Sequence, residues 1–195
     1  QPDYSVIGNV NVKAKLTIRP GVVIQFEPEK SLQIFPEGVL AAKGTSTERI
    51  IFTGREKVKG FWKGLLFSSN HPENELDHVL VAFGGSPEPE MGLKANVVLM
   101  GNDYSGAAIR ISNSSFWESA GYGLYVAGKS QLNYFSGNYF TNNTTSALYV
   151  PAEQLHQLDF FSHYTGNNGF DGVETGGTVN LEEDVTWTYF NDGSK

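Results

Sequence analysis

Two short stretches of the chain, Gly123–Val126 (Gly-Leu-Tyr-Val) and Ala147–Val150 (Ala-Leu-Tyr-Val), repeat one pattern at an interval of 24 residues. The same interval separates Phe116 from Phe140 and Phe140 from Tyr164. A fixed period of about two dozen residues that contains strands and no helix is typical of one coil of a parallel β-solenoid, because stacked coils bury a face that none can bury alone. The repeat therefore predicts a chain wound into a rod.

The other apolar runs of the chain are short and have the pattern of strands. Apolar and polar residues alternate in runs such as Leu16–Ile18, Leu32–Ile34 and Val79–Val81, each closed by Gly, Pro, Asn or Ser. The single candidate helical turn is Pro151–Leu155. An antiparallel sandwich does not need like residues at equal spacing, and the Leu and Asn signature of a leucine-rich horseshoe is absent. We therefore predict an all-β fold, a single parallel β-helix of about seven coils with little or no helix.

Stacked coils place equivalent residues in columns that face the interior. The period predicts one column of Leu65, Val97, Leu124, Leu148 and Val173, and a second of Phe67, Leu99, Val126 and Val150. Two further columns are Val81, Phe116, Phe140 and Tyr164, and Leu76, Ile111, Phe135 and Leu158. Turn asparagines are expected to bond to one another from coil to coil: Asn113, Asn138, Asn142, Asn143, Asn167 and Asn168.

The composition is that of a folded, acidic protein. The 195 residues are 39% hydrophobic and 18% charged, and 14 basic against 21 acidic side chains give a net charge of −7. Such a balance does not favour nucleic acid as a partner, since a phosphate backbone selects clustered positive charge. No apolar stretch approaches the roughly 18 residues of a membrane span. The absence of cysteine excludes disulfides and thiolate metal sites, and the length favours a single domain.

Several motifs along the chain carry a resemblance to a known family. The stretch Leu16–Phe26 has the pattern LTI-x-PGV-x-I-x-F, which resembles the opening of secreted bacterial right-handed parallel β-helix proteins of the pectin-lyase-like superfamily. Further stretches with this resemblance are Gly38–Thr45, Ile50–Thr53, Trp62–Phe67, Leu76–Val79, Phe83–Gly85 and Gly121–Val126. The branch of the superfamily that they resemble contains many surface and secreted proteins of unknown role.

The resemblance has consequences for the organisation and location of the protein. It implies a right-handed β-helix that a bacterium exports to the periplasm, the cell surface or the medium. We expect one domain over 1–195, with a lead-in or cap over 1–15, coils over 16–180 and a C-terminal tail or cap over 181–195. Because Val185–Gly193 resembles the lead-in to another such block, the chain is either one module of a longer protein or a single solenoid that this tail caps.

Catalytic motifs of the resembled family are missing. Its hydrolases carry an adjacent Asp-Asp and a Gly-His-Gly, and this sequence has neither. A lyase needs a base near acids that hold Ca²⁺, and the nearest such group is Asp77 and His78, with Arg110 one coil away. We therefore predict no catalytic residue. The alternative is a small polysaccharide lyase or glycoside hydrolase that acts on acidic glycans.

One turn, Gly166–Gly172, places oxygen ligands at alternate positions, loosely like a calcium loop. It lacks the terminal glutamate and the acid density of a true loop. The sequence therefore predicts no cofactor, with calcium at this turn as the alternative.

Strand alternation predicts a binding surface on the outside of the rod. If Leu124 and Leu148 face inward, Tyr125 and Tyr149 face outward. The full outer column is Leu66, Val98, Tyr125 and Tyr149. An exposed apolar and aromatic stripe often marks an interaction site.

Two tryptophans are further candidates for this surface. Trp62 and Trp117 each follow a Phe, so that one member of each pair should face outward. The prediction is a non-catalytic scaffold or adhesion module that binds a glycan or a surface protein. The alternative is that the outer column only stabilises the sheet, or that the loop Gly84–Ala95 covers it.

Overall fold

The protein is built almost entirely from β-strands. The computed structural model describes residues 1–87, 92–102, 104–179 and 186–194, and 43% of these residues lie in strands or bridges and 3% in helix. The helical element among the described residues is a short 3-10 helix, η1 (Ala152–Gln157), which covers most of the turn predicted at Pro151–Leu155. The predicted all-β class is confirmed.

The strands form three sheets, and each sheet takes roughly every third strand along the chain. Sheet A contains β1 (Tyr4–Val6), β4 (Val23–Phe26), β7 (Ile50–Gly54), β10 (Val79–Ala82), β13 (Ser115–Trp117) and β16 (Tyr139–Thr141). Sheet B contains β2 (Val10–Val12), β5 (Ser31–Ile34), β8 (Gly64–Phe67), β11 (Ala95–Leu99), β14 (Tyr122–Val126), β17 (Ser146–Tyr149) and β18 (Phe170–Glu174). Sheet C contains β3 (Lys15–Ile18), β6 (Val39–Lys43), β9 (Glu75–Asp77), β12 (Ala108–Ser112) and β15 (Gln131–Ser136).

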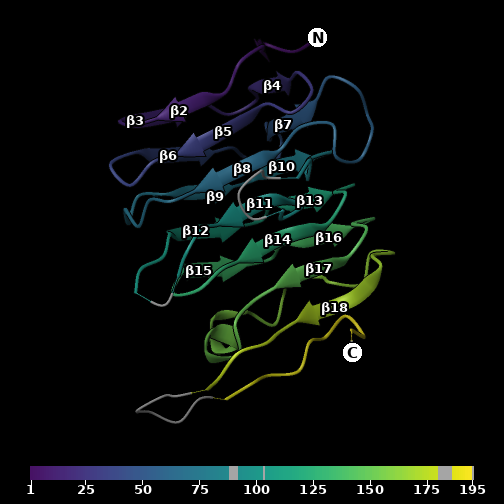
Figure 1. Cartoon of the computed structure of the whole chain (residues 1–195). Helices are drawn as coiled ribbons and strands as arrows, with labels where there is room; N and C mark the ends of the chain where they lie inside the picture. Colours follow the sequence, from purple (N-terminus) through teal and green to yellow (C-terminus); the bar gives the residue numbers. More distant parts are fainter. Residues whose placement is uncertain (88–91, 103, 180–185, 195) are drawn as a thin grey trace.

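The pairing between these strands is parallel in all three sheets. Three consecutive strands, one from each sheet, make what we call a winding, and the windings stack in order from the N-terminal to the C-terminal end (Figure 1). The antiparallel sandwich is therefore excluded. Three parallel sheets with this strand order are consistent with a parallel β-helix.

The strand register contains the interior columns predicted from the period, apart from Val150, Leu158 and Tyr164, which are buried but lie outside the strands. Val97 lies opposite both Leu65 and Leu124, and Leu148 lies opposite both Leu124 and Val173. In sheet C, Ile111 likewise lies opposite Leu76 on one side and Phe135 on the other. Like residues thus stack on like residues because the period of the sequence equals one winding.

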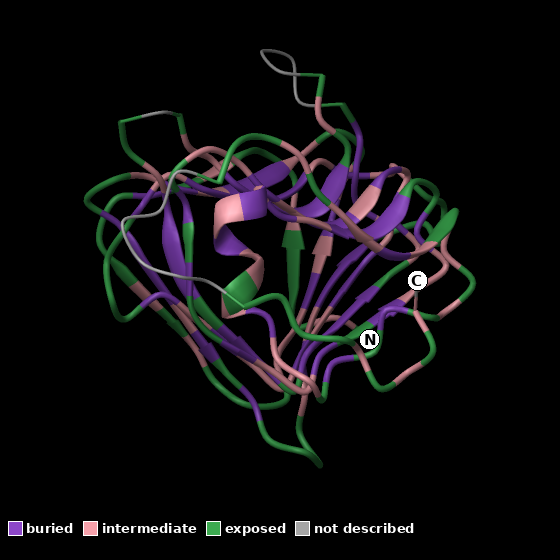
Figure 2. Ribbon diagram, turned by 90° about the horizontal axis from the view of Figure 1, so that it is seen from below, coloured by how far each residue is buried: buried purple, intermediate pink, exposed green. Residues whose placement is uncertain are grey.

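Aromatic side chains stack through the interior along sheet A. The ring centroids of Phe116 and Phe140 lie 5.0 Å apart, and those of Phe140 and Tyr164 lie 5.7 Å apart. All three rings are buried. Seen along the stack, the buried residues lie mainly in the strands and the exposed ones mainly in the connecting segments (Figure 2).

Asparagine amides connect the windings at their corners. Asn143 Nδ2 donates to Oδ1 of Asn168 at 2.9 Å, and Asn167 Nδ2 donates to Oδ1 of Asn142 at 2.8 Å. Asn142 and Asn167 have positive φ, a conformation that Asn adopts more readily than most residues. The predicted bonds between turn asparagines are confirmed for these two pairs.

The N-terminal end of the stack differs from the prediction. The segment 1–15, which was expected to be a lead-in or cap, already contains the strands β1 and β2. These strands pair with β4 and β5, so the sheets begin at Tyr4. Strands of three residues are too short for an alternating pattern to reveal them. An apolar hollow of about 760 Å³ opens beside β1, β2 and β3.

The C-terminal end is covered by the chain itself. The ring of Phe190 packs on Tyr164 with centroids 4.6 Å apart, and the Asp192 carboxylate accepts the backbone N–H groups of Tyr164 and Thr165. Residues 181–185 and 195 of the predicted tail lie outside the described residues. Within the described ranges, none of the helical structure is long and apolar enough to cross a bilayer.

Candidate functional site

The predicted outer column exists on the outside of sheet B. Tyr125 lies opposite Val98 and Tyr149 in the strand register, and the column continues to Leu66 at one end and Glu174 at the other. Leu66 and Val98 belong to a small apolar cluster that is separate from the main core. The outward direction of this column is therefore as strand alternation predicts.

Half of this column is nevertheless covered, which corrects the prediction of a continuous exposed stripe. Leu66 is 3% exposed and Val98 is 1% exposed. Leu93 and Met100 pack against them together with Tyr122 and Tyr125. Leu93 comes from the segment 84–95, the loop that the alternative interpretation of the outer column named as a cover. Leu66 and Val98 therefore offer no surface to a partner in this conformation.

The half-exposed part of the column is Tyr125 and Tyr149, and Tyr122 of the same sheet packs beside them. We call these three residues the tyrosine cluster. The rings of Tyr125 and Tyr149 are stacked, with centroids 4.6 Å apart and planes inclined by 10°. Tyr122 meets Tyr125 edge-on at 5.2 Å. Stacked and edge-on contacts of this kind stabilise by about 0.5–1.5 kcal/mol each beyond the burial of apolar area. These contacts therefore hold the three rings in a defined arrangement.

Tyr122 was not among the predicted residues because strand alternation fails beside it. Both Gly123 and Leu124 face the interior, since a Cβ placed on Gly123 would lie 2.6 Å from Cδ1 of Phe140, and Leu124 belongs to the core. Two inward residues in succession shift the phase of the alternation, so Tyr122 falls on the same side as Tyr125. The glycine in this position was the available signal.

A carboxylate anchors the tyrosine cluster. The Tyr122 hydroxyl donates to Oε2 of Glu174 at 2.9 Å. Burial and the hydrogen bond to Glu174 together raise the pKa of Tyr122 to about 12. Burial and the neighbouring Tyr149 also raise the pKa of Tyr125. The neutral phenol of Tyr122 is favoured in the folded state, so its contribution to stability is complete below pH about 10 and is lost as the pH rises through about 12.

Replacement of Glu174 should reveal this anchoring. We expect Glu174→Gln to move the ionisation midpoint of Tyr122 from about 12 back toward about 10, because the negative acceptor that opposes the phenolate is removed. Titration of the tyrosine Cζ signals by carbon NMR measures the midpoint. Glu153→Gln, a matched change at a nearby carboxylate, should leave it in place. An unchanged midpoint in Glu174→Gln would show that burial alone sets the pKa.

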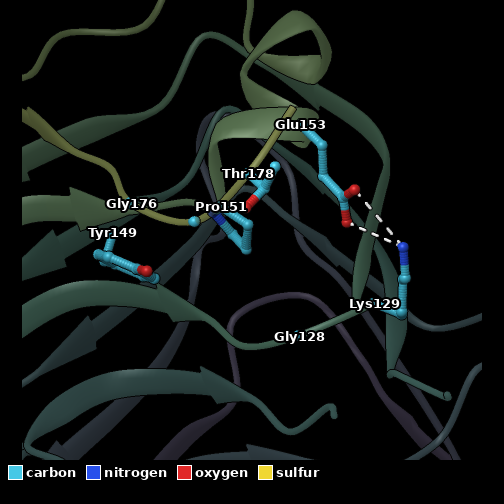
Figure 3. A pocket seen from close by; sticks show the side chains of 8 residues that line it. Gly128, Lys129, Tyr149, Pro151, Glu153, Gly176 and Thr178 are labelled. Carbon is cyan, nitrogen blue, oxygen red and sulfur yellow. Dashed lines mark hydrogen bonds and ion pairs between the residues drawn. The ribbon is translucent and has the colours of Figure 1, made fainter. Parts of the chain in front are cut away.

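A groove adjoins the tyrosine cluster at Tyr149. It has a volume of about 550 Å³ and is lined by Gly128, Lys129, Tyr149, Pro151, Glu153, Gly176, Gly177 and Thr178. Tyr149, Lys129 and Glu153 surround one open space, with Thr178 and Gly176 above it (Figure 3). Lys129 Nζ donates to Oε1 of Glu153 at 3.2 Å. We call this space the tyrosine groove.

The two tryptophans predicted for the binding surface differ in their exposure to solvent. Trp62 is fully buried: its ring stacks on Phe26 at 4.0 Å and its indole N–H donates to the carbonyl oxygen of Ala82 at 2.8 Å. It is therefore a core residue and not part of a binding surface. Trp117 is 39% exposed while Phe116 is buried, so the expectation that one member of this pair faces outward is confirmed. Trp117 lies in sheet A, away from the tyrosine cluster in sheet B.

The catalytic and metal candidates lie in different parts of the fold. Asp77 and His78 lie together, with Oδ1 and Nδ1 2.9 Å apart, but the register partner of Arg110 is Glu75. In the turn Gly166–Gly172, which loosely resembles a calcium loop, Asp171 Oδ1 accepts the backbone N–H groups of Gly166 and Asn168. Among the described residues, no group of three or more His, Asp or Glu side chains is placed to hold a metal ion.

The fold and this surface define an all-β protein of three parallel sheets with an outward tyrosine cluster beside a polar groove. No family model matches the chain, and no solved structure matches it. The protein bark beetle of Drosophila melanogaster is 34% identical to the chain over 139 residues, which are 71% of this chain. The chain spans only 4% of the length of that relative. The similarity therefore does not extend to the whole of that protein.

Proposed function

We propose that this protein is a non-catalytic binding module and that it binds a glycan in the tyrosine groove. The observation that carries the proposal is the junction at Tyr149, where an aromatic platform meets a groove with a charged wall. Glycan sites combine an aromatic surface for the apolar face of a sugar with polar groups for its hydroxyls.

The walls of the tyrosine groove supply these polar groups. The ion pair of Lys129 and Glu153 offers both donors and acceptors, and the carboxylate of Glu153 is mostly shielded, with 20% of its side chain exposed. Hydrogen bonds that involve charged groups are about twice as strong as neutral ones. Gly128, Gly176 and Gly177 also line the groove, and none of them carries a side chain that would narrow it. A volume of about 550 Å³ lies within the usual range for small-ligand sites.

The wider proposal concerns architecture and location. We propose that the three sheets are those of a right-handed parallel β-helix, supported by the Leu16–Phe26 motif and by the pairing of strands three apart. The motif resemblance also supports export by a bacterium to the periplasm, the surface or the medium. The short match to a much longer relative supports a role as one module of a longer chain.

A glycan array followed by calorimetry with any glycan that binds tests the proposed site. We expect Tyr149→Ala and Thr178→Trp each to weaken binding by about tenfold or more, the first by loss of the platform and the second by filling the groove. Tyr149→Ala also loses its stack on Tyr125, so its melting temperature should fall by a few degrees. Thr178 is exposed, and Thr178→Trp should leave the melting temperature unchanged.

Tyr104→Ala is the matched control, because Tyr104 is exposed and lies outside the groove. It should bind as the unchanged protein does. Normal binding by Thr178→Trp would place the glycan elsewhere and refute the proposed site. Release of reducing ends or unsaturated products from a panel of polysaccharides would refute the non-catalytic role, and favour the lyase or hydrolase alternative.

A further inference from the structure

A second groove runs across successive windings at the corner between sheets C and A, away from the tyrosine cluster. It has a volume of about 530 Å³. The residues that matter for its chemistry are Arg49, His78, Asn113, Tyr139, Phe161 and His163. Arg49, His78 and Asn113 each lie between a strand of sheet C and a strand of sheet A, and each belongs to a different winding. We call this space the corner groove.

The charge of the corner groove is opposite to that of the protein. The chain has a net charge of −7 with its histidines neutral, yet the one charged side chain among the described residues that line the groove is Arg49, which is positive. His78 and His163 add imidazole nitrogens that can form hydrogen bonds. Charges in a concave surface attract ligands of the opposite sign. The groove is therefore complementary to an anionic group.

Two carboxylates, Asp77 and Asp159, lie behind the groove wall and hold it through hydrogen bonds. Asp77 Oδ1 lies 2.9 Å from Nδ1 of His78 and accepts hydrogen bonds from Ser112 and Asn113, both at 2.9 Å. Although burial opposes ionisation, these bonds and the imidazole lower the pKa of Asp77. Asp159 accepts the backbone N–H groups of Gly137 and Phe161 through Oδ2. These bonds orient the groove walls, and the buried Oδ1 of Asp159 is left without a partner among the described residues.

The cationic end of the corner groove is held in place before any ligand arrives. Arg49 donates from Nη2 to the carbonyl oxygen of Val79 and to Oγ of Ser115, both at 2.8 Å. His78 has φ of 51°, which is uncommon for a residue other than glycine, and strained positions of this kind gather at functional sites. Asn113 occupies a similar backbone conformation in the next winding, with φ of 50°.

The other end of the corner groove is aromatic. The rings of Tyr139 and His163 are stacked, with centroids 4.6 Å apart and planes inclined by 16°. Tyr139 is 49% exposed and Phe161 is 68% exposed. An exposed aromatic surface of this kind suits an apolar side chain.

The distance between the two ends sets the length of the ligand. Arg49 directly precedes β7, and Tyr139 lies in β16, three strand pairings further along sheet A. At about 4.8 Å per pairing the separation is about 14 Å. An extended peptide rises about 3.3 Å per residue, so about four to five residues cover this distance.

We propose that the corner groove binds an extended acidic peptide, with a carboxylate at Arg49 and His78 and an apolar side chain at Tyr139 and Phe161. This site is separate from the tyrosine groove and needs no glycan. Its failure and the failure of the proposed glycan site are therefore independent.

The test uses labelled hexapeptides and fluorescence anisotropy. The probes are acetyl-Glu-Glu-Ser-Gly-Ser-Phe amide and the same residues in reverse order, and the control probes carry Lys in place of Glu. We expect one acidic probe to bind at least about tenfold more tightly than either lysine probe. Its affinity should fall as salt is raised from about 0.05 to about 0.3 M, since Arg49 is partly exposed to solvent.

Substitutions in the protein locate the site. His78→Asn removes the imidazole and keeps a residue that tolerates positive φ, and Phe161→Ala removes an exposed ring. Each should weaken the acidic probe at least about fivefold without altering the melting temperature by more than a few degrees. His156→Asn is the matched control at an exposed histidine outside the groove, and it should bind normally.

Three results would overturn the proposal. One is equal binding of the acidic and lysine probes, and another is undiminished binding in both groove variants. The third is binding of a sulfated glycan such as heparin that is weakened by His78→Asn and Phe161→Ala, while binding of the acidic peptides is not weakened by them. That result would assign the groove to an anionic glycan.

Discussion

Phe140→Ala is expected to lower the free energy of unfolding by about 3–5 kcal/mol. Phe140 is 1% exposed and stacks between Phe116 and Tyr164. The ring of Phe135 also lies beside it, with the two ring centroids 6.3 Å apart. Removal of its ring leaves a cavity in the middle of an aromatic column, and the rigid windings above and below cannot close it. For a domain of this size, each kcal/mol lowers the melting temperature by roughly 2–4 °C.

Urea unfolding followed by circular dichroism measures the change. Phe140→Leu retains most of the volume and should cost less than about 1.5 kcal/mol. Phe161→Ala removes an exposed ring, so it should cost less than about 0.5 kcal/mol. If Phe140→Ala proved as mild as Phe161→Ala, the interior column would not be a packed core, and the stacking of the windings would need another cause.

Asn74→Ala is expected to destabilise the protein by about 3 kcal/mol, through hydrogen bonds and not through lost volume. Asn74 is fully buried just before β9. Its Oδ1 accepts the N–H of Leu40 at 3.0 Å, and its Nδ2 donates to the carbonyl oxygens of Ser69 and Ala108, both at 3.1 Å. Leu40 and Ala108 belong to the preceding and following windings, so one amide joins three layers of the stack.

An isosteric variant separates hydrogen bonding from packing at this position. Asn74→Asp keeps the shape of the side chain but places a carboxylate oxygen against the carbonyl oxygens of Ser69 and Ala108, so it should destabilise at least as much as Asn74→Ala at pH about 7. Asn70→Ala, at an exposed neighbour, should change stability by less than about 0.5 kcal/mol. A mild effect of Asn74→Asp in chemical denaturation would contradict the bridging role.

The period of the sequence was sufficient to predict the interior. Every register pair observed between Leu65, Val97, Leu124, Leu148 and Val173 follows from the intervals between like residues. In a stacked fold each residue has its neighbours one repeat away, so spacing along the chain is a direct measure of position in space. The outward direction of Tyr125 and Tyr149 followed from the same reasoning.

The exposure of outward residues was beyond the reach of this reasoning. Leu66 and Val98 point away from the core, but Leu93 and Met100 cover them. Trp62 follows Phe61 in the manner of Trp117 after Phe116, yet it is Trp62 that is buried against Phe26. Alternation tells which side of a sheet a side chain takes, and it is silent about what another segment lays over that side.

By itself, the sequence determined the β-class, the repeat length, the columns of the interior and the side on which the tyrosines lie. These properties depend on intervals between residues, and an interval survives in any stacked arrangement. The tertiary structure alone decided which outward residues meet solvent. It alone brought Arg49 and His163 together in the corner groove, and Lys129 and Glu153 together in the tyrosine groove. The physical reason is that grooves form at corners and loops, whose paths depend on turn geometry and on contacts between windings and leave no periodic trace in the chain.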